Sequence, residues 1–197
     1  GAVFVPNGLW QRPARFPLRG ENPADTVARE YRAVREAIGI ADISSLGKFE
    51  IRGPDCVEFL NRTYINAFSA ETPGRIRYGV MLREDGMILD DGTTARFGDT
   101  HFILTTTGGA AGLVYTHLEF CLQVLWPELD VQIASVTDQW AQFSIAGPNA
   151  RELVNGLVKE NITNETFPYM ACSQATIGAV KGRLFRISFS GEEGYEI

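Results

Sequence analysis

The stretch KFEIRGPDCVEFLN, residues 48–61, decides the fold because its pattern occurs twice. It predicts a strand, a Gly-Pro junction and a short helix, since a proline at the first helical position has no amide hydrogen to lose and its fixed φ starts the turn. The same pattern returns as QFSIAGPNARELVN at residues 142–155. The residue after each proline, Asp55 or Asn149, can serve the free amides of the first helical turn. We therefore expect a duplicated strand–helix element with different material between its copies.

The segment between the two copies is rich in predicted strands. RIRYGVMLR (75–83) and MILD (87–90) flank the tripeptide EDG and predict a hairpin, because an Asp-Gly pair supplies the positive φ of a tight turn. TTARF (93–97) and HFILTTT (101–107) predict a second hairpin. A helix should come next at roughly 110–125. Its apolar side is expected to hold Leu113, Val114, His117, Phe120, Cys121 and Val124.

Outside the copies, NPADTVAREYRAVREAI (22–38) predicts a helix. Asn22 is a good N-cap, Pro23 fits the first helical position, and Gly39 can end the helix. Four apolar residues recur at helical spacing, so we expect an amphipathic helix that packs against the rest of the chain; they are Val27, Tyr31, Val34 and Ile38. Further strands are expected at 130–136, 174–180 and 183–190.

Composition excludes several classes of protein. The 197 residues are 45% hydrophobic and 21% charged, which is typical of a globular chain. A net charge of -6 argues against a general nucleic-acid surface, and the arginines at 12–19 and 75–77 are more simply explained as solvated faces. No apolar run approaches the ~20 residues of a membrane span, and the first residues lack a signal-peptide pattern. We therefore expect a cytoplasmic protein that binds neither nucleic acid nor a membrane.

Cysteine and histidine are sparse. Cys56, Cys121 and Cys172 are odd in number and widely spaced, which favours buried thiols in a reducing compartment over a disulfide framework. With two histidines and no CxxC, we expect no metal site.

The segment HFILTTTGGAAGLVYTHLEF superficially suggests a dinucleotide site. Only two glycines of the GxGxxG pattern are present, Gly109 and Gly112, and Thr107 occupies the first position. The preceding strand is also expected in an antiparallel hairpin, whereas the dinucleotide motif needs a parallel unit. We expect an ordinary strand-to-helix turn.

Two adjacent aspartates, Asp90 and Asp91, come after the apolar run at the start of MILDDGTTARFGD (87–99). Successive side chains of a strand point to opposite faces, so one of the two carboxylates should face inward. An inward carboxylate is costly unless it is hydrogen-bonded or has a task. The alternative is that both are strand-end residues that bond the backbone of the Asp91-Gly92 turn.

Four segments carry a family resemblance, in order and across essentially the whole chain: GIADISSLGKFEIRGPD, RIRYGVMLREDGMILDDGTTARF, QFSIAGPNA and FSGEEGYE. Together they resemble the glycine cleavage T-protein (aminomethyltransferase) family. Within these segments the sequence is most similar to the carboxyl-terminal, T-protein-like region of heterotetrameric sarcosine oxidase alpha subunits. The similarity is carried by ADISSLGK, YGVMLREDG, MILDDGTTAR and SVTDQWAQFSIAGP. The resemblance implies an α+β fold with a ferredoxin-like part and an antiparallel Greek-key part around a folate pocket. Because SGEEGYEI stops in mid-pattern, we expect residues 1–197 to be the amino-terminal portion of such a domain in a longer chain.

The resemblance also implies a catalytic residue. The family's second aspartate faces the folate, which places the role on Asp91 and leaves Asp90 as the outward, structural partner. One-carbon transfer from an amine to tetrahydrofolate passes through cationic, iminium-like species and needs a proton removed from a folate nitrogen. A fixed carboxylate stabilises that charge and can act as the base.

Further pocket positions carry over from the family. Tyr78 matches its pocket tyrosine, and Glu196 matches the acid that hydrogen-bonds the pterin ring. Without the family resemblance, a surface strand residue is the favoured interpretation of Glu196. Three other positions depart from the aminomethyltransferases: Leu46 replaces Met, Thr106 replaces Asn and Phe189 replaces Tyr. These departures favour the sarcosine oxidase type.

The expected function is thus the tetrahydrofolate-binding, one-carbon-transfer part of a sarcosine oxidase alpha-like enzyme, which captures the carbon removed from sarcosine as 5,10-methylenetetrahydrofolate. Its expected partners are a small amine substrate, folate and the other subunits of a hetero-oligomer, with any flavin or NAD on other parts of the enzyme. The alternatives are a stand-alone aminomethyltransferase, a dimethylglycine-oxidising enzyme, or a non-catalytic folate-binding module on the same fold.

Overall fold

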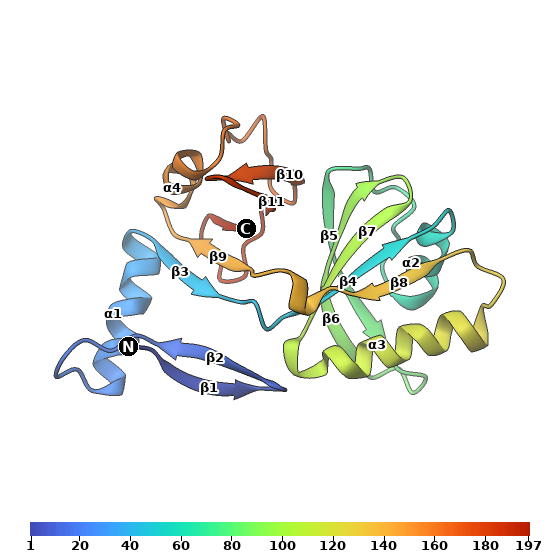
Figure 1. Cartoon of the computed structure of the whole chain (residues 1–197), viewed down its shortest axis with the longest axis horizontal. Coiled ribbons are helices and arrows are strands. Elements are labelled where there is room, and N and C mark those ends of the chain that lie inside the picture. Colours follow the sequence, from blue (N-terminus) through green and yellow to red (C-terminus); the bar gives the residue numbers. More distant parts are fainter. The chain divides into compact units, whose positions relative to one another are not determined.

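The structure, a computed structural model, describes residues 1–197 and divides into two compact units (Figure 1). One unit is continuous and covers Leu46–Trp140. The other is assembled from Gly1–Ser45 and Ala141–Ile197, so it is interrupted in sequence by the first.

The continuous unit is an antiparallel sheet with helices against one face. Its strand order is β5-β6-β7-β4-β8. Apolar side chains of the sheet pack with those of the helices into one core that includes Phe49, Ile51, Phe59, Leu60, Phe102, Leu104, Val114 and Leu118. The elements are β4 (Gly47–Arg52), α2 (Cys56–Thr63), β5 (Arg75–Leu82), β6 (Ile88–Gly98), β7 (His101–Thr106), α3 (Ala111–Phe120) and β8 (Gln132–Ser135).

The interrupted unit holds a second antiparallel sheet, in the order β10-β11-β12-β9-β3, and a separate two-stranded hairpin. Its core gathers Ile145, Val154, Ile162, Phe167, Leu184 and Tyr195. The elements are β1 (Val3–Asn7), β2 (Trp10–Arg15), α1 (Pro23–Glu36), β3 (Gly39–Asp42), β9 (Phe143–Ala146), α4 (Ala150–Leu157), β10 (Cys172–Ile177), β11 (Val180–Phe185) and β12 (Gly194–Glu196).

The duplicated element is confirmed, with one copy in each unit. Each glycine before the proline has a positive φ, 137° at Gly53 and 130° at Gly147, which strongly favours glycine. Neither of the side chains after the prolines caps its helix, contrary to expectation. Asp55 instead accepts a hydrogen bond from the amide of Asp130 at 2.8 Å, so it joins the turn to the segment leading into β8.

The two predicted hairpins are confirmed as β5–β6 and β6–β7. Because β7 pairs antiparallel with both β6 and β4, the Gly-rich turn after it is not part of a parallel βαβ unit. The expected strand over 183–190 is shifted, since β11 begins at Val180 and the chain turns at Gly178 instead.

The predicted helix near the amino terminus is confirmed, and Asn22 accepts from the amide of Asp25 at 2.9 Å. Its expected packing face is only partly right. Val34 and Ile38 are half-buried, and Ile38 packs against the core of this unit, as predicted. Val27 and Tyr31, however, are more than half exposed, and Thr26 is the buried residue of the helix.

The helix predicted at 110–125 is α3 continued by a π-helical turn over Cys121–Leu125. The expected apolar side is only partly right, because Leu113, Phe120 and Val124 are exposed. The stripe that meets the sheet is instead Val114, Leu118 and Cys121, at helical spacing.

All three cysteines are buried and free, as expected. No helix combines the length and apolar character needed to cross a bilayer.

Candidate functional site

Strand β6 carries the two aspartates beside an irregularity in its pairing with β5. Met81 lies opposite Asp90, but Leu82 lies opposite Ile88, so Leu89 has no partner across the ladder. Such a β-bulge re-aims the side chains next to it. Leu89 packs against the core of the continuous unit and Asp90 is only 6% exposed, so both residues turn toward the helix side of the sheet.

Our expectation that Asp90 faces outward is therefore wrong. Residues directly opposite in an antiparallel pair share a face, and the partner of Asp90 is the fully buried Met81. Asp90 is satisfied there by the amide of Thr107, which donates to Oδ2 at 3.0 Å. Asp91 points the other way and is exposed.

Asp91 lies against Tyr78 on the face of the sheet away from α2 and α3. The tyrosine hydroxyl donates to Asp91 Oδ2 at 2.6 Å. This hydrogen bond raises the pKa of Tyr78, and partial desolvation and the charges of Asp91 and Asp90 raise it further. The tyrosine thus remains a protonated donor that holds the carboxylate in place.

The same face carries a polar row that sequence reasoning missed. Thr93 lies opposite Tyr78, and its Oγ1 is 2.6 Å from Thr105 Oγ1 on β7. Thr105 in turn lies opposite Lys48 on β4, whose Nζ donates to the carbonyl of Leu46 at 3.0 Å. The alternation of apolar and polar residues along one strand could not reveal this row, because the row depends on the register of four strands.

Two predicted positions in this unit are placed differently from Asp91. Thr106 is 2% exposed and lies on the helix side, opposite Gly47, and its hydroxyl has no hydrogen-bond partner. Leu46 is half-buried, just before β4, and contributes its backbone carbonyl to Lys48.

The remaining two predicted residues belong to the interrupted unit. Glu196 is half-buried on β12, and its Oε2 accepts from Gln142 Nε2 at 2.8 Å. Phe189 lies between β11 and β12 with a fully exposed ring. The structure thus brings Asp91 and Tyr78 into direct contact, whereas Glu196 and Phe189 sit in a separate compact unit.

One close backbone approach and two hydrogen bonds fix the strands of the site. A Cβ on Gly92 would lie 1.8 Å from the carbonyl oxygen of Thr105, so only glycine allows β7 to come this close to β6. At the sheet edge, the amide of Val80 donates to Asn66 Oδ1 at 3.0 Å, and its carbonyl accepts from Ile65 at 3.0 Å. The strand that carries Tyr78 is therefore fixed on both sides.

A second carboxylate, Glu71, was not singled out from the sequence. It is 5% exposed and neither of its oxygens has a hydrogen-bond partner. Burial raises the pKa of Glu71 to about 7, although Arg77, Arg96 and Arg75 oppose that rise. Glu71 lies in the loop between α2 and β5, and its burial comes from tertiary packing that no local sequence pattern reveals.

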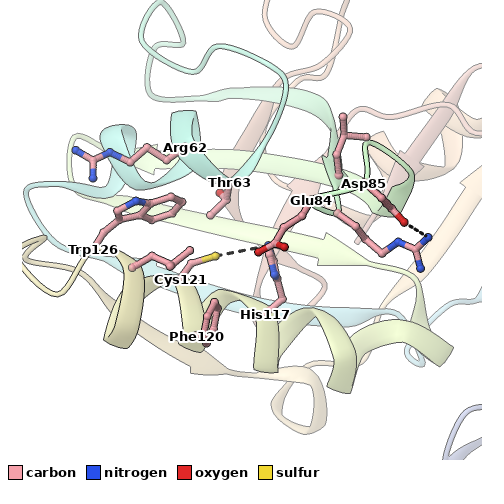
Figure 2. A pocket seen from close by; sticks show the side chains of 11 residues that line it. Arg62, Thr63, Glu84, Asp85, His117, Phe120, Cys121 and Trp126 are labelled. Carbon is pink, nitrogen blue, oxygen red and sulfur yellow. Dashed lines mark hydrogen bonds and ion pairs between the residues drawn. The ribbon is translucent and has the colours of Figure 1, made fainter.

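A surface cavity of about 600 Å³ opens elsewhere on the continuous unit (Figure 2). His117 and Cys121 line it, with Nε2 and Sγ 3.6 Å apart, and Arg62 stacks over Trp126 at 5.4 Å. Burial lowers the pKa of His117 and raises that of Cys121, so the pair is a neutral imidazole and a protonated thiol. It is therefore not an activated nucleophile. None of the predicted site residues lines this cavity.

Comparison with known proteins gives a consistent result. The family model described as the GCVT N-terminal domain matches residues 1–197. The sarcosine oxidase subunit alpha of Rhizobium meliloti is 54% identical over the whole of this chain, which spans 20% of that relative.

Two solved structures share the fold. The glycine cleavage system aminomethyltransferase T from Bartonella henselae matches 100% of this chain with 49% of its own, at a TM-score of 0.82 and 23% identity. A chain of the heterotetrameric sarcosine oxidase from Corynebacterium sp. U-96, solved with pyrrole 2-carboxylate, matches 91% of this chain with 86% of its own, at a TM-score of 0.62 and 13% identity. The expected T-protein-like α+β fold is confirmed.

Proposed function

The chain belongs to the GCVT N-terminal domain family, and from this premise we propose that it is the tetrahydrofolate-binding, one-carbon-transfer part of a sarcosine oxidase alpha-like enzyme. The identity to the Rhizobium meliloti subunit supports the oxidase branch of the family. Because the chain spans about a fifth of that relative, the activity of the whole protein is part of the proposal.

The observation that carries the proposal is the contact between Tyr78 and Asp91. Tyr78 occupies one carboxylate oxygen of Asp91, Oδ2, at 2.6 Å. The other oxygen, Oδ1, has no protein donor, and the side chain is exposed on the open face of the sheet. A carboxylate that is oriented by a neighbour but still able to accept a proton suits general-base chemistry.

Tetrahydrofolate, when bound, supplies the nitrogens that take up a one-carbon unit at the oxidation level of formaldehyde. In the proposed reaction, Asp91 accepts the proton that leaves a folate nitrogen, and its negative charge favours the cationic form of the carbon donor. Tyr78 keeps the carboxylate oriented by donating to Oδ2. Thr93 lies opposite Tyr78 on the same face of the sheet, and Thr105 and then Lys48 continue the polar row on the next two strands.

Glu196 is proposed as the acceptor for the amino and ring N–H groups of the pterin, because a carboxylate accepts strongly from such donors. Leu46, Thr106 and Phe189 remain predictions of the family resemblance. We further propose sarcosine as the amine, other subunits of a hetero-oligomer as partners, and residues 1–197 as the amino-terminal portion of the folate-binding domain. The heterotetramer in which a structural neighbour was solved supports the choice of partners.

The test is Asp91→Asn in the full-length protein, which keeps the side-chain shape and the contact with Tyr78 but removes the base. A flavin on another part of the assembled enzyme would take the two electrons from sarcosine, so the assay uses the complete hetero-oligomer. We expect the formation of 5,10-methylenetetrahydrofolate from sarcosine and tetrahydrofolate in this assay to fall by about 100-fold or more, the range of a positioned general base. Binding of tetrahydrofolate, measured by calorimetry, should change by only a few-fold.

The matched control is Asp99→Asn, which alters an exposed aspartate just after the same strand, β6. It should leave both measurements unchanged. If Asp91→Asn turns over like the parent, Asp91 is not the base. If the parent binds tetrahydrofolate but forms no methylene product, the chain is a non-catalytic folate-binding module.

A further inference from the structure

The backbone pairing between strands β6 and β7 does not extend as far as the two aspartates. The last backbone-paired residues on this side are Thr94 and Leu104. Beyond them, the amide of Thr93 donates to the side chain of Thr105 at 3.2 Å. Side chains therefore replace the regular ladder in the part of β6 that carries the proposed site.

Asp90 makes the second of these side-chain bridges. Its Oδ2 accepts from the amide of Thr107, which begins the turn that leads from β7 into α3. The carboxylate is buried beside the unpaired residue Leu89, so it lies directly behind the bulge. A hydrogen bond to an ionised acceptor is among the stronger ones in proteins.

The charge of Asp90 acts on both faces of the sheet. On the helix side, burial and the Asp90 charge together raise the pKa of Tyr64. On the open face, the same charge adds to the rise in the pKa of Tyr78. Asp90 is therefore electrostatically connected to the exposed pair as well as adjacent to it in sequence.

We propose that Asp90 is the positioning residue of the Asp91–Tyr78 pair: its buried carboxylate ties the bulge of β6 to the Thr107 amide and thereby holds Asp91 on the open face against Tyr78. The inference rests on the proposed function only in its effect on turnover, because that effect requires Asp91 to be the base. The contact that Asp90 holds can be measured without any reaction.

The measurement is the ionisation of Tyr78 in the full-length protein, monitored by fluorine NMR of fluorotyrosine-labelled samples, with Tyr78→Phe to assign the signal. Asp91→Ala gives the reference for a tyrosine that has lost its acceptor. In Asp90→Ala the midpoint of Tyr78 should fall most of the way to that reference, because Asp91 is no longer held. In Asp90→Asn it should fall only slightly, since the amide oxygen still accepts from Thr107 while the charge is gone.

A second variant removes the donor and leaves Asp90 intact. The φ of Thr107 is -56°, close to that of proline, so Thr107→Pro deletes the amide hydrogen at a backbone angle that proline adopts. The proline ring also occupies the place of that hydrogen and so excludes the Asp90 carboxylate from it. Its Tyr78 midpoint should also fall toward the Asp91→Ala reference. This variant decides the question if Asp90→Ala does not fold.

Turnover provides the functional readout. We expect Asp90→Ala and Thr107→Pro to lower kcat by about 10- to 100-fold, as misplaced catalytic groups do, with a smaller change in KM, and Asp90→Asn to restore most of the rate. Parent-like ionisation of Tyr78 in both Asp90→Ala and Thr107→Pro would overturn the proposal. If the ionisation shifts while Asp91→Asn is fully active, the positioning role stands and the proposed function fails.

Discussion

The two copies of the strand–Gly–Pro–helix element have the same backbone conformation at the Gly-Pro junction and differ in the strands that follow them. In each, an asparagine on the helix accepts from an amide seven residues later: Asn61 from Phe68 and Asn155 from Ile162, both at 2.7 Å. The first copy leads into the hairpin that carries Tyr78 and Asp91, whereas the second leads into β10 and β11. The repeated element is thus a scaffold, and the proposed chemistry belongs to strands added after one copy.

The two copies also differ in how they bury the same position of their strands. Phe49 is 1% exposed and packs against Tyr115, with ring centroids 5.4 Å apart, whereas its counterpart Phe143 is 38% exposed. Phe49→Ala should lower the free energy of unfolding by about 4 kcal/mol, the usual loss for a buried aromatic. Phe143→Ala should lower it by about 1 kcal/mol or less. Denaturant titration of both variants measures the difference, and equal losses would contradict the assigned burial.

Substitution of the two positive-φ glycines tests whether the copies share a backbone requirement. A Cβ would lie 2.1 Å from the carbonyl oxygen of Asp130 at Gly53, and 2.6 Å from that of Ala37 at Gly147. Each Gly→Ala change should lower the free energy of unfolding by about 3 kcal/mol, with the larger loss at Gly53. The control is Gly112→Ala on α3, where nothing lies within 4 Å of the new methyl. A tolerated change at either of the two glycines would break the equivalence.

The paired asparagines offer a finer comparison. Asn61→Ala and Asn155→Ala each leave a backbone amide without its acceptor, which costs about 1–3 kcal/mol. Because Asn155 also donates to the carbonyl of Ile162 at 3.1 Å, while Asn61 donates to the side chain of Ser69, the loss should be slightly larger for Asn155. Thermal unfolding of the two variants side by side gives the ranking.

The loop that follows the first copy gives an effect that depends on pH. Burial raises the pKa of Glu71 to about 7, so the folded state holds a proton that the unfolded chain releases near 4.5. This contribution to stability is present below about pH 4.5 and is lost as the pH rises through about 7. Glu71→Gln should therefore gain stability relative to the parent between about pH 5 and about pH 8, whereas the exposed control Glu84→Gln should not. Unfolding free energies at the two pH values provide the check, and parallel curves for Glu71→Gln and the parent would contradict it.

Local signals in the sequence were sufficient for much of the fold. The Gly-Pro junctions, the N-cap at Asn22 and the Asp-Gly turn each depend on neighbouring residues, and the structure confirms the elements that they predict. The family resemblance added the topology, which periodicity alone does not contain.

The site was less accessible because it depends on pairing between strands. Alternation correctly indicated that one aspartate faces inward, but the bulge at Leu89 decides which one, and a bulge is a property of two strands together. The burial of Glu71 and the polar row through Thr93 and Thr105 likewise arise only when distant segments meet. The exposed face of α1 shows the same limit, since periodicity identifies an apolar side and not what covers it.

The interruption of one unit by the other has a consequence for biosynthesis. Strand β3 pairs with β9, so Asp42 lies opposite Phe143 although the whole continuous unit separates them in sequence. Leu46–Trp140 emerges from the ribosome before β9 does, and domains generally fold as units during synthesis. The continuous unit can therefore complete its sheet while β3 still waits for a partner. Once the continuous unit is folded, it replaces what would otherwise be a long flexible loop between β3 and β9. The conformational entropy lost when β3 and β9 pair is therefore smaller.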